Sequence, residues 1–439
     1  MRLALPFLLF ASVADAGDLP EPLNDTDFAP PGAEAEIALG HLLFYDPVLS
    51  GNRDVACATC HHPRFATSDG LSLGIGDGGT GLGPERQADP ENPPEQRIPR
   101  NSPALFNMGA TALTVMFHDG RIEVDASRPS GLRTPLGEEM VRGFDSLLSA
   151  QTMFPVLSPD EMAGHYQENE IAKAVRQGRI TGEGGAWDLI SARVAAMPAY
   201  AKMFAEAYPE IAAGRAIAFT DISNAIAAFV AWEWRADDSA FDRHLRGEDT
   251  LSAEAQAGMR LFYGEAGCAE CHSGKLLSDM DFHATGSPQL GPGKAERFET
   301  HQRDTGRQRV TGRAEDAFAF RTPPLRNVAR TGPWGHAGAF DDLAAFLRHH
   351  ADPIAGLTAY EDAAVLPELA GIVDDWAVMR SDALRGEIAQ AAERHPRVAL
   401  TERDIAVLLA FLDSLTDEGA LAGRLGVPER VPSGLPVER

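Results

Sequence analysis

All four cysteines of the chain fall into two copies of one short motif, and each copy ends in a histidine. The two copies read Cys57-Ala-Thr-Cys60-His61 and Cys268-Ala-Glu-Cys271-His272. Cys-x-x-Cys-His is the attachment sequence of c-type haem. Its spacing lets both sulfurs bond one porphyrin, and the histidine then places its imidazole under the iron. The sequence therefore predicts two covalently bound c-type haems, with each motif histidine as the proximal iron ligand.

Other interpretations of a Cys-x-x-Cys pair are a disulfide, a thioredoxin-like redox pair, or half of a zinc site. A disulfide does not explain the histidine after each pair. A zinc site would leave both histidines unused, and it would have to join two pairs that lie more than 200 residues apart. Haem attachment accounts for all six residues.

The first residues, "MRLALPFLLFASVADAGD", have a basic start, a short apolar run and a small-residue cleavage site. This pattern predicts a cleaved secretory signal peptide over residues 1–16, with a buried N-terminal helix as the alternative. No later apolar run is long enough for a transmembrane segment. We therefore expect a periplasmic protein, which agrees with haem attachment outside the bacterial cytoplasm.

The charge balance argues against some classes of partner. The 439 residues include 64 acidic and 39 basic residues, for a net charge of −25. Such a chain should repel nucleic acids and anionic lipid surfaces. We therefore expect no nucleic-acid partner.

A repeat indicates how the motifs are positioned. "ALGHLLFYDPVLSGNRDVACATCH" and "AQAGMRLFYGEAGCAECH" share Gly-x-x-Leu-Phe-Tyr, a turn and the haem motif. Repetition implies two related units, each with an amphipathic helix leading into its motif. We expect a mostly α fold with two cytochrome c-like haem domains, over residues 17–235 and 236–439, joined by long loops.

Helix-start signals support this fold class. Thr220 is predicted to cap a helix with the apolar stripe Ile222, Ile226, Phe229 and Val230. Thr401 and Asp404 resemble a capping box before a second helix, and Ser252 can cap a third. Strand-like alternation is scarce.

Several stretches outside the haem motifs resemble one family, the bacterial di-haem cytochrome c peroxidases and their relative MauG. The resemblance covers nearly the whole mature chain and includes the methanobactin-associated relatives. The stretches are "RNSPALFN", "FHDGR", "QTMFPVLSPDEM", "FDRHLRGE", "FHATGSPQLGPG" and "FRTPPLRNVARTGPWGHAGAFDDL".

The resemblance implies that the N-terminal haem reacts with peroxide. The loop over residues 63–100 has no histidine that could block the iron, so we expect an open distal position. In the family a glutamate moves the proton between the peroxide oxygens, and Glu161 matches it, with Gln151 and Pro155 at the family spacing. Glu139 is the alternative acid, and a surface role for Glu161 is the structural alternative. Residues 121–150 look like an insertion.

For the C-terminal haem, the resemblance puts the sixth ligand fourteen residues after the histidine of Pro-x-x-His-x-Gly. Counting from His336 gives His350, where ordinary peroxidases have methionine and MauG has tyrosine. His349, Met280, Met379 and His336 itself are alternatives, and a surface position at a helix end is another reading of the His pair. Imidazole favours oxidised iron relative to methionine, so bis-histidine ligation would suit MauG-like chemistry.

The resemblance also implies an inter-haem path and a calcium ion. His118 stands where the family has a tryptophan between the haems, and Trp334 lies near the same interface or only packs there. Asn101, Thr331 and Pro333 match the family's calcium ligands, which suit a hard cation.

Taken together, these features predict a periplasmic di-haem c-type peroxidase that reduces hydrogen peroxide at the N-terminal haem. Electrons would come through the C-terminal haem from a small electron-transfer protein, either a c-type cytochrome or a cupredoxin. The alternative is a MauG-like enzyme whose peroxide-derived high-valent haems oxidise side chains of a specific protein client. A plain electron-transfer cytochrome is a third possibility, which Glu161 and the loop without histidine argue against.

Overall fold

Helices joined by long loops make up most of the computed structural model, which describes residues 19–294, 302–361, 363–369, 371 and 374–439. The predicted mostly α fold is confirmed at this level. The predicted signal peptide lies outside the described residues. None of the helices in the described ranges is both long and apolar enough to cross a lipid bilayer.

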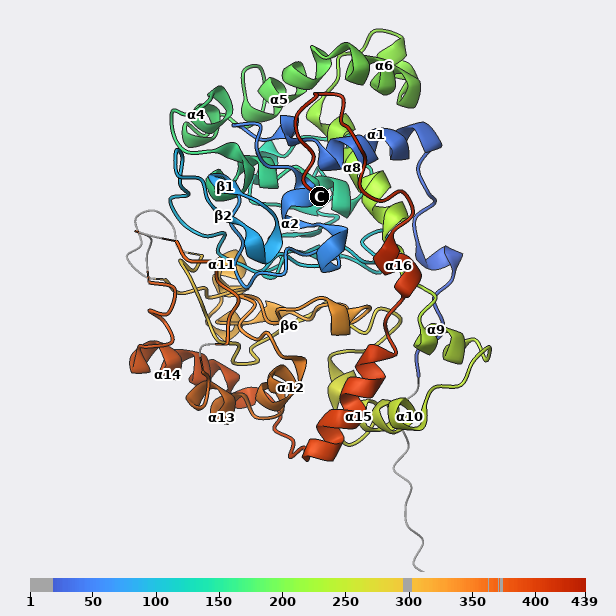
Figure 1. Cartoon of the computed structure of the whole chain (residues 1–439), viewed down its shortest axis with the longest axis vertical. Coiled ribbons are helices and arrows are strands. Elements are labelled where there is room, and N and C mark those ends of the chain that lie inside the picture. Colours follow the sequence, from blue (N-terminus) through green and yellow to red (C-terminus); the bar gives the residue numbers. More distant parts are fainter. Residues whose placement is uncertain (1–18, 295–301, 362, 370, 372–373) are drawn as a thin grey trace, which may run out of the picture.

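The helices divide between the two halves of the chain (Figure 1). The N-terminal half contains α1 Glu34–Tyr45, α2 Cys57–Cys60, α3 Leu147–Thr152, α4 Glu170–Arg176, α5 Ala186–Ala195, α6 Pro198–Ala207, α7 Pro209–Ala212 and α8 Phe219–Glu233. The C-terminal half contains α9 Ala240–Leu245, α10 Ala253–Phe262, α11 Gln308–Thr311, α12 Leu343–Ala351, α13 Pro353–Thr358, α14 Asp382–Ala391, α15 Glu402–Asp413 and α16 Glu418–Ala422.

The strands are two or three residues long and form small antiparallel sheets. They are β1 Gly79–Thr80 with β2 Gln87–Ala88, then β3 Val115–Met116, β4 Ile122–Val124 and β5 Leu132–Arg133, and finally β6 Phe282–His283 with β7 Phe320–Arg321. The apparent insertion over residues 121–150 supplies β4 and β5 and leads into α3.

Each haem motif follows one helix of a packed pair. In the N-terminal half α1 packs against α8, and in the C-terminal half α10 packs against α15. The glycine of the repeat lies at each crossing. A Cβ atom on Gly40 would lie 1.8 Å from the carbonyl oxygen of Ala225, and one on Gly258 would lie 1.9 Å from that of Val407. The repeated glycine therefore lets the helix that precedes each motif touch its partner's backbone.

Replacing Gly258 by alanine should destabilise the protein by about 2–3 kcal/mol, because the new methyl group can fit only if α10 moves away from α15. The matched control is Gly386→Ala in α14, where a Cβ would meet nothing within 4 Å. Alanine there should be neutral or slightly stabilising, because it is the better helix former. Thermal unfolding of the haem-loaded variants measures both. Equal midpoints would contradict the close crossing.

Two of the three predicted helix caps are confirmed. Thr401 and Asp404 form a reciprocal capping box at α15, and the Ser252 hydroxyl accepts a hydrogen bond from the backbone of α10. The cap predicted at Thr220 is wrong, since α8 begins at Phe219. The backbone N–H of Ala218 donates to the carboxylate of Asp221 (2.8 Å), and this bond starts the helix two residues earlier.

After α8, most of the described buried apolar residues belong to other clusters. Ala236 still belongs to the apolar cluster of the N-terminal half, whereas Phe241 belongs to a second cluster that also includes Phe262 and Phe411. A third cluster joins Leu73 to residues of the C-terminal half. The division into two haem domains with a boundary near residue 236 stays a prediction.

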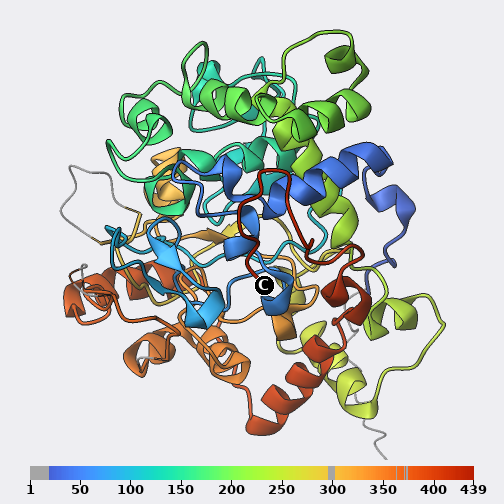
Figure 2. The same cartoon turned by 45° about the horizontal axis from the view of Figure 1, so that its top comes forward.

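The C-terminal tail returns to the N-terminal half, where it crosses α1 and ends near α2 (Figures 1 and 2). The Ser433 hydroxyl donates to buried Asp46 (2.6 Å), and the N–H of Leu425 donates to Glu233 (3.0 Å). At the end of the tail, Glu438 accepts from Thr59 of the first haem motif (2.5 Å). The last residues thus support the first haem motif.

Candidate functional site

The first haem motif forms the short helix α2, and its histidine is held in one orientation. Nδ1 of His61 lies 3.0 Å from the carbonyl oxygen of Thr67 and 3.2 Å from the Ser102 hydroxyl. A carbonyl can only accept, so Nδ1 carries the proton and Nε2 is left as the donor atom for a metal.

The second motif is a 3-10 turn over Cys268–Glu270, with the same arrangement at its histidine. Nδ1 of His272 lies 3.1 Å from the carbonyl oxygen of Leu277. Nε2 is again left to face a ligand. Both motifs therefore present one fixed imidazole and two thiols, as covalent haem attachment requires.

The thiols do not suit a redox pair. None of the cysteines is in a disulfide. Burial raises the pKa of Cys57 to about 12 and that of Cys268 to about 11. Reactive dithiols need a lowered pKa, because the thiolate is the nucleophile. Among the described residues, no candidate metal-binding group joins the two cysteine pairs, and only Cys271 lies in such a group, with Asp279 and His283.

Glu161 lies near the first haem motif, because its charge acts on Cys60. It is carried by a π-helical turn over Pro159–Ala163. Burial raises the pKa of its carboxyl group, and the positive charges of Lys294 and Arg121 partly offset this effect. The charge of Glu161 in turn contributes to the raised pKa of Cys60, after burial and Asp69. The carboxyl group is thus desolvated and close enough to Cys60 to affect its pKa.

Gln151, in α3, points an unsatisfied group into the protein. Its Oε1 atom is buried and has no hydrogen-bond partner in the described part of the chain. Pro155 begins the next turn, Pro155–Leu157. A buried amide oxygen without a protein partner is free to accept a hydrogen bond from a small polar ligand. Glu139, the alternative acid, is exposed.

The second motif faces the histidines of α12. Burial lowers the pKa of His350 to about 3, and the imidazoles of His272, His395 and His349 add to the effect. His350 and His272 therefore lie close enough to interact. Nδ1 of His350 is buried without a hydrogen-bond partner among the described residues. The backbone carbonyl of His350 accepts from Nε2 of His395 (3.2 Å).

The neighbouring His349 packs against Phe340 and Gly356. It is 3% exposed, and a Cβ on Gly356 of α13 would lie 2.3 Å from its Nδ1. Neither ring nitrogen of His349 has a hydrogen-bond partner in the described ranges. Both histidines thus have buried ring nitrogens without hydrogen-bond partners among the described residues. Only His350 interacts with His272 of the second haem motif.

The other ligand candidates have partners of their own. The sulfur of Met280 lies 3.6 Å from the guanidinium of Arg321, and Met379 is buried in the third apolar cluster. The His336 ring stacks on Phe320 with centroids 3.8 Å apart. These contacts favour His350 over the three alternatives.

A buried ionic network joins the two halves between the motifs. The guanidinium of Arg100 binds Asp304 (2.6 Å) and Asp119 (2.8 Å). Burial raises the pKa of Asp119, but Arg100 and Arg121 outweigh this and lower it to about 2. The buried ion pairs therefore join Arg100 to Asp304, which lies 204 positions later in the chain. The sequence showed the motifs that carry Arg100 and Asp119 but no sign of this pairing.

His118 lies in this interface, with Nε2 3.2 Å from the carbonyl oxygen of Asn101. Burial and then the charge of Arg100 lower the pKa of His118 to about 4, so the ring is neutral. Trp334 belongs to the apolar cluster of the C-terminal half, and its indole N–H donates to the carbonyl oxygen of Val328 (2.9 Å). These contacts show that Trp334 packs in the C-terminal half, and its role in electron transfer stays a prediction.

The predicted calcium ligands come from two segments that touch. The backbone N–H of Asn101 donates to the carbonyl oxygen of His336 (2.9 Å), three residues after Pro333. The side-chain amide of Asn101 donates to Leu71 (2.8 Å). The hydroxyl of Thr331 donates to Val328 rather than across the interface. Calcium binding stays a prediction.

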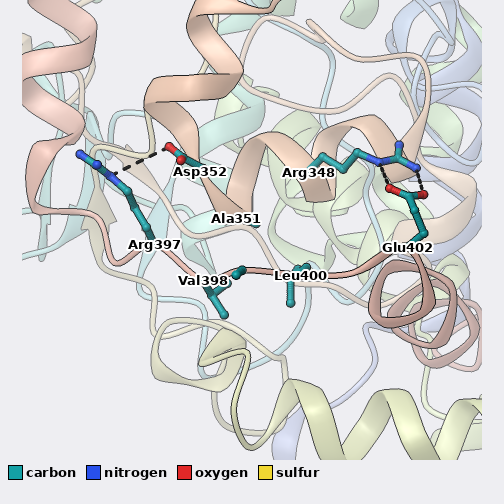
Figure 3. Close-up of a pocket in the computed structure, with 8 residues that line it drawn as sticks. Arg348, Ala351, Asp352, Arg397, Val398, Leu400 and Glu402 are labelled. Atoms are coloured by element: carbon teal, nitrogen blue, oxygen red, sulfur yellow. Dashed lines mark hydrogen bonds and ion pairs between the residues drawn. The ribbon is translucent and has the colours of Figure 1, made fainter.

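A surface pocket of about 480 Å³ adjoins α12 (Figure 3). Its rim includes the ion pairs of Arg348 with Glu402 (2.7 Å) and of Arg397 with Asp352 (4.0 Å). Neither His349 nor His350 lines it. The pocket is therefore separate from the two histidines of α12.

Comparison with known proteins identifies relatives that match much of this chain. Residues 34–250 match the family model described as di-haem cytochrome c peroxidase. The methylamine utilization protein MauG of Methylorubrum extorquens is 29% identical over 325 residues, which cover 73% of this chain and 70% of that protein. The cytochrome c551 peroxidase of Pseudomonas aeruginosa is 28% identical over 314 residues, with 71% and 70% covered.

Solved structures agree with these relatives. A MauG-like protein associated with microbial copper homeostasis has a TM-score of 0.56 and 25% identity, over 94% of this chain and 97% of that one. The diheme peroxidase BthA of Burkholderia thailandensis has a TM-score of 0.55 at 20% identity, over 97% of each chain, and supports the fold alone.

Proposed function

Because this chain belongs to the family of di-haem cytochrome c peroxidases and MauG, we propose that it reduces hydrogen peroxide at its N-terminal haem. Membership makes it a peroxidase-like oxidoreductase with two c-type haems. The observation that carries the proposed site is the desolvated carboxyl group of Glu161, which lies close enough to Cys60 of the first motif to affect the pKa of its thiol.

The roles of the residues at this site follow from their environments. A c-type haem held by Cys57, Cys60 and His61 would supply the redox chemistry, since the two haems together can provide the two electrons that reduce hydrogen peroxide to water. Glu161 accepts a proton from one peroxide oxygen and returns it to the other, so that the oxygen–oxygen bond breaks with water as the leaving group. The free amide oxygen of Gln151 orients the protonated form, and Pro155 shapes the wall. The loop without histidine leaves the distal side to these residues.

Cys268, Cys271, His272 and His350 would hold the second haem, which would supply electron transfer rather than a peroxide site. His272 and His350 would supply one imidazole nitrogen on each side of its iron, and two neutral imidazoles favour the oxidised metal. A small electron-transfer protein, either a c-type cytochrome or a cupredoxin, would deliver electrons here. His118, which is neutral and lies between the halves, would lie on the route to the first haem.

A second candidate function is oxidation of a protein client, as in MauG. His350 in place of methionine favours it, because a haem that holds its oxidised state is a poorer acceptor from an ordinary c-type cytochrome. The likeness to MauG and to a MauG-like structure is further support. In both cases we propose a periplasmic enzyme, because the sequence predicts a signal peptide. We also propose that it binds one calcium ion near Asn101.

Steady-state turnover separates the two functions. If the protein is a peroxide scavenger, mixing it with hydrogen peroxide and a reduced c-type cytochrome should oxidise the cytochrome at about 1–1,000 per second. Reduced cupredoxin serves as the second donor, and the cytochrome without enzyme is the blank. No turnover with either donor, together with an oxidised form that persists after peroxide is removed, would favour the client-oxidising role.

A further inference from the structure

A group of side chains that could bind a metal ion lies outside both haem motifs, on the segments that precede β1 and α4. It consists of Asp77, His165 and Glu168, whose ligand atoms all lie within 4.8 Å of one another. Nδ1 of His165 is 3.3 Å from Oε1 of Glu168 and 3.9 Å from Oδ2 of Asp77. We propose that these three side chains bind a divalent transition-metal cation of the zinc class.

Asp77 points an unsatisfied oxygen into this group. Its side chain is fully buried, and Oδ2 has no hydrogen-bond partner in the described part of the chain. Asp54 and Glu168 carry further negative charge close to it. A buried carboxylate that faces a second one is costly unless a cation balances it. A bound divalent ion would supply that balance.

The spacing suits a small ion. A zinc ion about 2.0–2.2 Å from each ligand places tetrahedral ligand atoms about 3.4 Å apart. The measured 3.3 and 3.9 Å need only small side-chain shifts. One imidazole and two carboxylates match zinc better than calcium, which prefers oxygen ligands throughout.

Neighbouring groups hold the ligands in place. Nδ2 of Asn52 donates to Oδ1 of Asp77 (3.0 Å) and to Oε2 of Glu168 (2.7 Å), so each carboxylate keeps its other oxygen for the ion. The backbone N–H of His165 also donates to Glu168 (2.8 Å). Nε2 of His165 lies 3.4 Å from the N–H of Glu95. Metal binding at Nδ1 would move the proton to Nε2. The protonated Nε2 could then no longer accept the long hydrogen bond from the N–H of Glu95.

The group adjoins the turn that carries Glu161. The N–H of Asp77 donates to the carbonyl oxygen of Asp160 (3.2 Å), and a Cβ on Gly76 would lie 2.6 Å from the carbonyl oxygen of Glu161. His165 and Glu168 follow the same turn in the chain. A bound ion would therefore clamp the turn to the loop before β1 and steady Glu161. This consequence rests on the proposed role of Glu161, whereas the ion site itself does not.

Calorimetric titration of the haem-loaded, chelator-treated protein tests the proposal. Zinc chloride should bind with a stoichiometry of one at this site, and calcium chloride should not compete. His165→Gln and Asp77→Asn should each weaken zinc binding at least tenfold. His283→Gln is the matched control, since His283 belongs to the other group of candidate ligands, with Cys271 and Asp279, and should leave this binding unchanged.

Absence of saturable zinc binding, or equal affinity in wild type, His165→Gln and Asp77→Asn, would overturn the proposal. If these variants fail to fold, zinc-edge X-ray absorption of the wild-type protein decides. One imidazole with oxygen ligands at about 2.0–2.2 Å supports the site, and a shell without imidazole or with sulfur refutes it. Both readouts are independent of peroxide turnover, so they separate failure of the ion site from failure of the proposed function.

Discussion

Replacing Glu161 by glutamine should slow the reaction of the oxidised enzyme with hydrogen peroxide by about 10²- to 10⁴-fold, the range typical of a lost general acid–base group. Glutamine has almost the same shape but can neither accept nor return the proton. The haem should stay bound, because Glu161 attaches nothing covalently. Stopped-flow absorption at increasing peroxide concentration gives the second-order rate constant.

Glu139→Gln is the control for this prediction. Glu139 also precedes a methionine, but its side chain is exposed, so its removal should leave the rate within about twofold of wild type, as expected for a surface substitution. If Glu139→Gln reacted slowly with hydrogen peroxide and Glu161→Gln reacted at the wild-type rate, Glu139 would be the general acid–base group instead. Unchanged rates in both would remove the proton-transfer role from this region altogether.

The pH dependence gives the same experiment a second readout. Burial raises the pKa of Glu161 above the ordinary glutamate value of 4.5. Only the carboxylate can accept the proton, so the rate should rise with pH through the raised pKa and level off above it. The rising limb should therefore lie above pH 4.5 in the wild type and vanish in Glu161→Gln.

Local motifs in the sequence were enough to predict the chemistry-bearing residues. The haem motifs each fit within five consecutive residues, and Gln151, Pro155 and Glu161 within eleven. The repeat likewise predicted the helix before each motif. The roles of these residues still stand as predictions, but the structure puts Glu161 near Cys60 and His350 near His272.

The features that sequence reasoning missed all depend on residues distant in the chain. The tail contact of Glu438 with Thr59 and the Arg100–Asp304 pair join positions hundreds of residues apart, and no local spacing encodes them. Lys294 near Glu161 is a third case. The misplaced cap at Thr220 has another cause, because several polar residues near a helix start compete and tertiary packing decides among them.

Replacing His350 by methionine should raise the reduction potential of the second haem. The shift should be on the order of 0.1 V or more, within the ~0.8 V range that axial ligands span. The thioether is a weaker donor than imidazole to ferric iron, so the variant should favour the reduced metal. Low-temperature EPR should show the bis-imidazole low-spin signal in the wild type and its loss in the variant, while the high-spin signal of the first haem remains.

His349→Met is the matched control, because the two histidines are adjacent on α12 and only one of them interacts with His272. Its low-spin signal and potential should match those of the wild type. The opposite pattern, with His349→Met altered and His350→Met unchanged, would move the ligand by one residue. A wild-type spectrum with two low-spin signals would mean that the first iron is capped, and an open peroxide site at His61 would then be untenable.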